Sequence, residues 1–240
     1  MILLFHIFVG EKYKLIMFLY IVQMKTHFKL IILCLLCNVF IGTFYVSGQS
    51  EIQVTEVHTD DLPTDIQYEG SLLNAWSWAD DLGDHLLITT QTGIHLSPKF
   101  DHETEGLDAE IFAYHFIITD DNSKQTWKIY DYIRDCPVDI EAAFVTNSTK
   151  ITDLNEDGVT EIWLMYKTAC RGDVSPSDMK LIMYEGSNKY AMRGQNKVQL
   201  SDNEYYGGDY TFDRAFKQSP KVFKHFAKAM WEKNILQTWE

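Results

Sequence analysis

The sequence lacks the short motifs that identify the most common classes of enzyme. It contains no HExxH zinc helix, no GxSxG nucleophile turn, no phosphate-binding P-loop and no dinucleotide-binding glycine run. The histidines that follow residue 48 do not stand at a zinc-ligand spacing; they are His58, His85, His95, His102, His115 and His225. The sequence therefore names no reaction, and we assign no catalytic residue.

Basic residues are scarce relative to acidic ones. The 240 residues include 21 Lys and Arg against 34 Asp and Glu, a formal net charge of −13. Residues 1–48 hold four Lys and one Glu, which leaves 17 basic and 33 acidic side chains after them. This balance argues against nucleic acid and anionic membrane surfaces as partners. Hydrophobic residues make up 46% of the chain, enough for a packed core, so a disordered chain is not expected.

The N-terminal part of the chain predicts an export signal. Residues 24–29 form a short basic segment, residues 30–46 form an apolar run, and Gly48 provides a small residue before a cleavage point. We therefore expect a signal peptide that is cleaved after Gly48. A retained membrane anchor is the alternative.

A second apolar run, Leu15 to Val22, precedes this signal, and a natural start at Met24 would account for it. The predicted organisation is an N-terminal extension plus signal peptide over residues 1–48 and a single secreted β-rich domain over residues 49–240. The expected location is the periplasm, the cell surface or the extracellular space, with no membrane contact after cleavage.

Cysteine is rare, and two of the four cysteines, Cys34 and Cys37, lie within the apolar run of the signal. Cys136 and Cys170 remain, and an even pair in an exported chain favours a disulfide. Two buried free thiols are the alternative.

Short strands separated by turn residues predict the fold class. Alternating or β-rich runs indicate strands at 72–78, 85–90, 110–118, 126–133, 140–146, 162–166, 179–185 and 189–194. Residues 202–210 indicate a surface loop. Ser219 as a cap and Pro220 in the first turn predict a final helix, whose apolar stripe comprises Val222, Phe223, Phe226, Ala229, Met230, Lys233 and Ile235. We expect a mainly β protein, either an antiparallel sheet or sandwich or a partial propeller-like sheet, with this amphipathic helix docked on it.

One stretch, Ile151 to Tyr166 (ITDLNEDGVTEIWLMY), combines residue types and spacing that indicate chemistry. Side-chain oxygens recur at alternate positions of a tight loop, at Asp153, Asn155, Asp157 and Glu161, and Val159 can add a backbone carbonyl. Gly158 permits the sharp turn that such a loop needs. Because Ca²⁺ takes roughly six to eight oxygen ligands, the stretch predicts a calcium loop. An Asx-rich turn without metal is the alternative.

The loop is not an EF-hand, because Leu164 occupies its twelfth position and a strand follows in place of a helix. A DxNxDGxxE loop that leads into a strand resembles the calcium loops of FG-GAP and VCBS repeats, the blade units of integrin-like propellers. The resemblance implies four side-chain ligands and one carbonyl ligand; they are Asp153, Asn155, Asp157 and Glu161, and Val159. It covers one loop and one strand.

A longer set of motifs resembles a second family. It comprises Asp135 to Pro137, Thr152 to Gly158, Tyr166 to Cys170, Asp173 to Pro176 and Met179 to Glu185. These residues are similar to those of an exported protein family of Bacteroidota that is named for a link to surface polysaccharide biosynthesis. The resemblance is strongest over residues 130–195. It implies an envelope role and carries over no catalytic residue.

Two functions fit these observations. The first is a non-enzymatic, calcium-stabilised protein that assists cell-surface polysaccharide assembly or binds glycan, with surface glycan or envelope proteins as partners. Its candidate sugar-stacking aromatics are Trp76, Trp78, Trp127, Tyr205 and Tyr206, and a place in the core is the alternative for several of them. The second is a polysaccharide-processing enzyme, of the glycoside hydrolase or lyase type, with a structural calcium. Its candidate carboxylates are Asp80, Asp81, Asp84, Asp101 and Glu103, for which solvated loop charges are the alternative.

Overall fold

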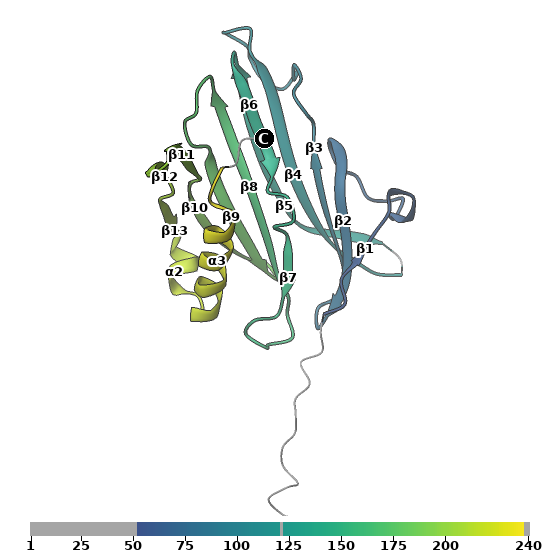
Figure 1. Ribbon diagram of the computed structural model, residues 1–240. Coiled ribbons are helices and arrows are strands. Elements are labelled where there is room, and N and C mark those ends of the chain that lie inside the picture. The colour runs from purple at the N-terminus through teal and green to yellow at the C-terminus, as the bar shows by residue number, and fades with distance from the viewer. Residues whose placement is uncertain (1–51, 121, 238–240) are drawn as a thin grey trace, which may run out of the picture. The chain divides into compact units, whose positions relative to one another are not determined.

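The computed structural model describes residues 52–120 and 122–237, which belong to the second of two units, residues 1–50 and 51–240. The expected start at Met24 and the cleavage after Gly48 lie outside these residues. The described part consists of two antiparallel sheets followed by C-terminal helices (Figure 1). The predicted fold class is thereby confirmed, and the strands do not form propeller blades.

The first sheet has five strands in the order β1-β2-β3-β4-β5. They are β1 (Thr55–Glu56), β2 (Ser71–Asp80), β3 (Gly83–Gln91), β4 (Leu107–Ile118) and β5 (Ser123–Cys136). A 3₁₀ turn, Thr59–Asp61, follows β1. The β2–β3 and β4–β5 hairpins confirm the strands that the alternating pattern predicts.

The second sheet has six strands, in the order β13-β10-β9-β8-β6, with β7 also paired to β8. They are β6 (Asp139–Phe144), β7 (Lys150–Thr152), β8 (Glu161–Arg171), β9 (Asp178–Glu185), β10 (Asn188–Gln195) and β13 (Tyr210–Phe212). A two-stranded ribbon, β11 (Lys197–Ser201) and β12 (Glu204–Gly207), lies between β10 and β13 in the chain. The loop expected at residues 202–210 is therefore wrong, because exposed tyrosines there pair in β12 and not in an irregular segment.

The two sheets pack against each other through alternate side chains, as expected for a sandwich. One core cluster unites residues of both sheets, among them Trp78, Leu87, Ile111, Ala113, Ile129, Ile162, Leu164 and Ile182. All are buried, so this cluster joins the two sheets in one core.

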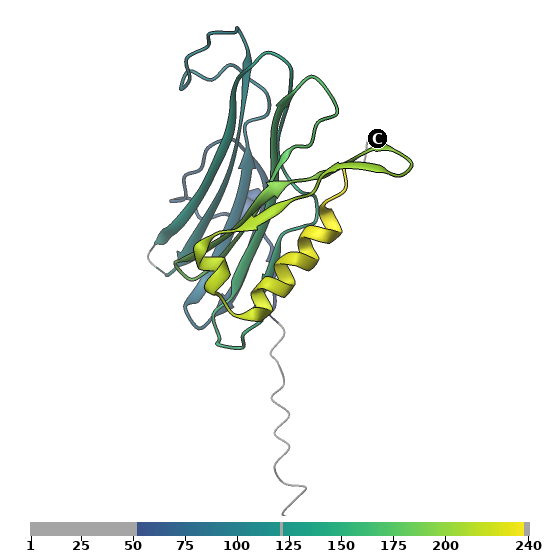
Figure 2. The same cartoon turned by 90° about the vertical axis from the view of Figure 1, so that its left-hand side faces the viewer.

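The opposite face of the second sheet is covered by α2 (Arg214–Gln218) and α3 (Lys221–Asn234) (Figure 2). The face and the helices share a cluster that includes Trp163, Met165, Leu181, Met183, Phe216, Phe223, Ala227, Met230 and Trp231. Among the described residues, no helix is both long enough and apolar enough to cross a membrane.

Two details of the predicted helix are wrong. The buried stripe is Phe223, Ala227, Met230 and Trp231, at helical spacing, whereas Val222, Ala229 and Lys233 are exposed. Ser219 does not cap α3, because its hydroxyl donates to the carbonyl of Phe216 at the end of α2, an element that the sequence pattern did not reveal.

Candidate cation-binding loop

The loop between β7 and β8 is held by its own acidic side chains. The carboxylate of Asp153 accepts hydrogen bonds from the backbone N–H groups of Asp157 and Gly158, each at 3.1 Å. Asp157 accepts from the N–H of Val159 at 2.9 Å. Glu156 and Gly158 both have positive φ, at 59° and 82°, which gives the sharp turn that the glycine predicts. These bonds turn the side chains of Asp153 and Asp157 toward the loop backbone.

Glu161 is the first residue of β8 and is fully buried. Its carboxylate accepts from the hydroxyl of Thr152 at 2.6 Å and from the N–H of Leu154 at 2.9 and 3.1 Å. Burial, reinforced by the negative charges of Asp153 and Glu185, raises the pKa of Glu161 to about 7 in spite of these hydrogen bonds. The surroundings of Glu161 therefore disfavour its ionised form, and a nearby positive charge would stabilise that form.

Glu185, at the end of β9, joins the loop although the sequence pattern did not identify it. It is the cross-strand partner of Glu161 in the β8–β9 register. The Asn155 side-chain amide nitrogen donates to Glu185 at 2.8 Å and to Asp157 at 2.9 Å. Burial and the charges of Asp157 and Asp153 raise the pKa of Glu185. Local spacing does not identify this residue, because its place depends on which strands pair and in which register.

Asp157 and Glu185 thus share the amide of Asn155, and the negative charges of Asp153 and Glu161 lie nearby without a basic partner. Within the described ranges, no Lys, Arg or His forms a salt bridge with Asp153, Asp157, Glu161 or Glu185. No three His, Cys, Asp or Glu side chains in residues 52–120 and 122–237 are arranged so that they could hold a metal ion. The predicted ligands Asp153, Asp157 and Glu161 therefore do not form such a group in the described residues, because their carboxylates accept hydrogen bonds from the loop backbone and from Thr152.

The loop is also tied to the first sheet through the β2–β3 turn. Asp80 accepts from the N–H and the hydroxyl of Thr160, at 2.9 and 2.7 Å, and the indole of Trp78 donates to the same hydroxyl at 2.8 Å. The N–H of Asp81 donates to the carbonyl of Gly158 at 2.9 Å. The conformation of the loop is therefore coupled to the contact between the sheets.

Asp80 and Asp81, two of the acids proposed for an enzyme, thus form hydrogen bonds with the loop through a side chain and a backbone N–H respectively. Asp80 also accepts from the ring of His85 at 2.6 Å. Although burial raises its pKa, hydrogen bonds from Thr160 bring the pKa of Asp80 below its usual value. Asp101 and Glu103 lie in the β3–β4 connection, away from the β2–β3 turn in the chain, and Asp84 is exposed in β3.

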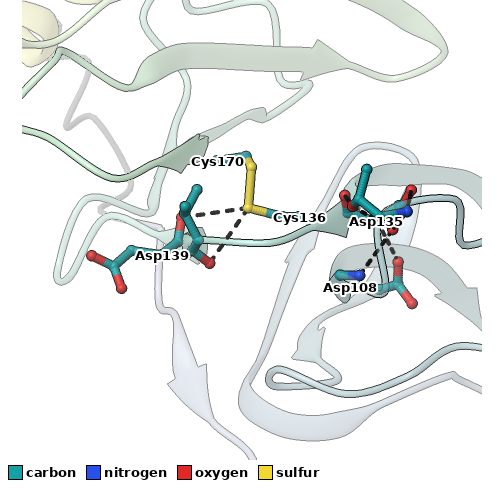
Figure 3. The surroundings of a disulfide bond; sticks show 8 residues. Asp108, Asp135, Cys136, Asp139 and Cys170 are labelled. Carbon is teal, nitrogen blue, oxygen red and sulfur yellow. Dashed lines mark hydrogen bonds between the residues drawn. A yellow bond between two sulfur atoms is a disulfide. The ribbon is translucent and has the colours of Figure 1, made fainter.

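The structure brings Cys136 and Cys170 to disulfide distance, as predicted, with Cα atoms 5.8 Å apart (Figure 3). The bridge joins the end of β5 to β8, the strand that follows the loop. The bridged sulfur of Cys136 lies 3.5 Å from the Val138 carbonyl and 3.7 Å from that of Asp139. Because a bridged sulfur carries no proton, these are close contacts and not hydrogen bonds.

The candidate aromatics fall into two groups. Trp78 and Trp127 are buried between the sheets, where Trp78 stacks on His85 and Trp127 stacks on Tyr184. These two belong to the core, which confirms for them the alternative to a sugar platform. Tyr205 and Tyr206 are exposed on β12, and Trp76 is half-buried.

The assignment of the loop depends on this geometry and on the sequence motif alone. Comparison of the chain with protein-family models, with curated proteins and with solved structures gave no match.

Proposed function

We propose that the protein is an exported, calcium-stabilised β-sandwich that binds glycan at the cell surface without cleaving it. One observation carries the calcium part of this proposal. Asp157 and Glu185 both accept from the amide of Asn155, and the charge of Asp153 helps to raise the pKa of Glu161 and of Glu185. Among the described residues, no basic side chain forms a salt bridge with these four acids. A hard divalent cation supplies the missing positive charge.

The ligand set follows from the loop. Asp153, Asn155, Asp157 and Glu161 would hold Ca²⁺ through side-chain oxygens, and Val159 through its carbonyl, as the FG-GAP and VCBS resemblance implies. The structure adds Glu185 as a further carboxylate from the neighbouring strand. The Asn155 amide nitrogen donates to two of these carboxylates, Asp157 and Glu185, which supports a site that takes a group able to satisfy both. The ion would supply stability and take no part in a reaction.

Its stabilising effect would extend beyond the loop. Thr160 and Gly158 form hydrogen bonds with Asp80 and Asp81 of the first sheet. Holding the loop in one conformation therefore also holds the contact between the two sheets. The Cys136–Cys170 bridge restrains the other end of β8, which suits a protein that works outside the reducing cytoplasm.

The glycan part is supported by the resemblance of residues 130–195 to the Bacteroidota family and by the composition. The excess of acidic side chains disfavours polyanions as ligands and leaves uncharged polymers as the better match. Exposed tyrosines and the half-buried Trp76 provide rings for sugar contact.

Thermal melting tests the proposal with the full chain, expressed with its own leader and purified from exporting cells. Wild type should melt at a higher temperature in Ca²⁺ than in EDTA, and Asp157→Ala should abolish the difference. Asp202→Ala, an exposed acid on the β11–β12 ribbon, is the matched control and should retain it. An EDTA-insensitive wild type would refute the calcium part, and release of sugar fragments from a bound glycan would refute the non-enzymatic part.

A further inference from the structure

A cavity of about 580 Å³ is lined by residues of both sheets, and none of the residues that carry the cation proposal is among them. The first sheet contributes Asn74 and Trp76 of β2 and Gln91 of β3. The β6–β7 connection contributes Thr146 and Asn147 from the second sheet. Its volume is within the roughly 300–1,000 Å³ of small-ligand sites. Because two sheets supply its walls, the cavity exists only in the folded sandwich.

The floor of the cavity is aromatic and held in place. Trp76 and Phe144 line the cavity and also pack against the core cluster between the sheets. Trp76 is fixed further by its position in the β2–β3 register opposite Leu87. A ring that is anchored by the core on one side and open to a cavity on the other is a stacking platform with little rotamer freedom left to lose.

The walls carry uncharged groups that can both donate and accept hydrogen bonds. They are the side chains of Asn74, Gln91, Thr146, Asn147 and Thr149. None of these five side chains forms a hydrogen bond with another residue of the described chain. Amide and hydroxyl groups match sugar hydroxyls, which also donate and accept. Their capacity is therefore available to a ligand.

The β6–β7 connection is preorganised. The N–H of Val145 donates to the carbonyl of Met165 at 2.9 Å, and the N–H and hydroxyl of Ser148 donate to the carbonyl of Val145 at 3.2 and 2.7 Å. Asn147 has a φ of 57°, a conformation that Asn tolerates well. The turn so formed holds the backbone at Asn147 in place, which reduces the backbone ordering cost on binding.

The charge of the lining selects among ligand classes. Glu56 and Lys150 are its acidic and basic residues and offset one another. An anion would need a net positive lining, and an apolar ligand would leave the amides without partners. We infer that this cavity is the binding site for a segment of uncharged oligosaccharide, with Trp76 as the stacking platform. The inference rests on the glycan part of the proposed function and not on its calcium part.

Calorimetric titration tests the inference with the full chain purified after export, in the presence of Ca²⁺. The probes are maltohexaose, cellohexaose, mannohexaose and xylohexaose, with hexagalacturonic acid as the charged comparator. Wild type should bind at least one uncharged hexaose. Trp76→Ala should weaken that binding about tenfold or more, since a lost ring contact of about 1.4 kcal/mol corresponds to tenfold.

Because Trp76 also packs on the core, Asn74→Ala and Gln91→Ala provide variants that leave the fold intact. Each should weaken binding severalfold with an unchanged melting temperature. Asp202→Ala, which changes an exposed acid at the β11–β12 turn, is the control and should bind as wild type does. The indole N–H resonance of Trp76, assigned by its loss in Trp76→Phe, should shift on titration.

Three results overturn the inference. If wild type binds an uncharged hexaose but the cavity variants bind it equally well, the cavity assignment is wrong and the glycan function stands. Binding confined to hexagalacturonic acid refutes the uncharged ligand class. If wild type binds none of the five probes, both the inference and the glycan part of the proposed function fail.

Discussion

Replacing Glu161 with Gln should stabilise the protein at neutral pH in EDTA and destabilise it, relative to wild type, in Ca²⁺. Glu161 is fully buried, and its pKa is raised from the usual 4.5 to about 7. Gln has nearly the same shape and carries no charge. The substitution therefore removes the charge repulsion from Asp153 and Glu185, and with it a ligand that the cation would need.

The expected gain in stability follows from the raised pKa of Glu161. A carboxyl group whose pKa is higher in the folded state contributes stability that is fully present below pH 4.5 and is lost as the pH rises through about 7. At about 1.4 kcal/mol per pH unit the loss approaches about 3 kcal/mol by pH 8. The Gln side chain cannot accept all the hydrogen bonds from Thr152 and Leu154, which costs about 1 kcal/mol. The net gain of about 2 kcal/mol corresponds to roughly 4–8 °C for a domain of this size.

The assay is thermal melting of both proteins from pH 4 to pH 8, in EDTA and in millimolar Ca²⁺. The difference in melting temperature between variant and wild type reports on Glu161 alone, because His115 is present in both proteins. This comparison is needed because the lowered pKa of His115 makes stability fall, and not rise, as the pH decreases over part of the range. Glu141→Gln is the control. Although burial raises its pKa, Ser177 and Lys167 hold the pKa of Glu141 below its usual value, so this variant should melt lower at neutral pH, with or without Ca²⁺.

The reasoning is wrong if Glu161→Gln melts below wild type at pH 8 in EDTA. It is also wrong if Ca²⁺ raises the melting temperatures of the two proteins equally, because Glu161 would then not be a ligand of the cation.

Three further predictions concern the framework. Gly158→Ala should cost about 1–3 kcal/mol in a denaturant titration, because φ is 82° and the new Cβ would lie 2.2 Å from an Asp81 oxygen; adding Asp81→Ala should relieve the contact but not the φ strain. Replacing both Cys136 and Cys170 with Ser should lower the free energy of unfolding by about 3–4 kcal/mol, and an unchanged value would show that the bridge does not form. Burial and His85 lower the pKa of His115 to about 3, so its contribution to stability is present above pH 6.5 and is lost as the pH falls toward about 3; His115→Phe should flatten this acid limb of the melting profile.

The sequence predicts individual strands and loops better than it predicts their register and packing. Period-two alternation locates the hairpins of both sheets, and Asp153 to Glu161 stand out because their oxygens recur along a single loop. Glu185 and Asp81 reach the same loop from another strand and from the other sheet, through a register and a packing contact that local spacing does not encode. Trp78 and Trp127 were open to either interpretation, because an alternating aromatic marks a face of a strand without saying whether that face is buried.

The cavity at Trp76 lies beyond local pattern for the same reason. Asn74 and Asn147 face it from strands and turns far apart in the chain, and each side chain alone is an ordinary surface amide. Their shared position appears only once the two sheets have packed.

Calorimetric titration of Ca²⁺ into the EDTA-treated and dialysed full chain tests the cation site most directly. The account predicts saturable binding with one ion per chain in wild type and in Asp202→Ala, and no binding in Asp157→Ala. Absence of binding to wild type, or an Asp157→Ala variant that binds as wild type does, would contradict it.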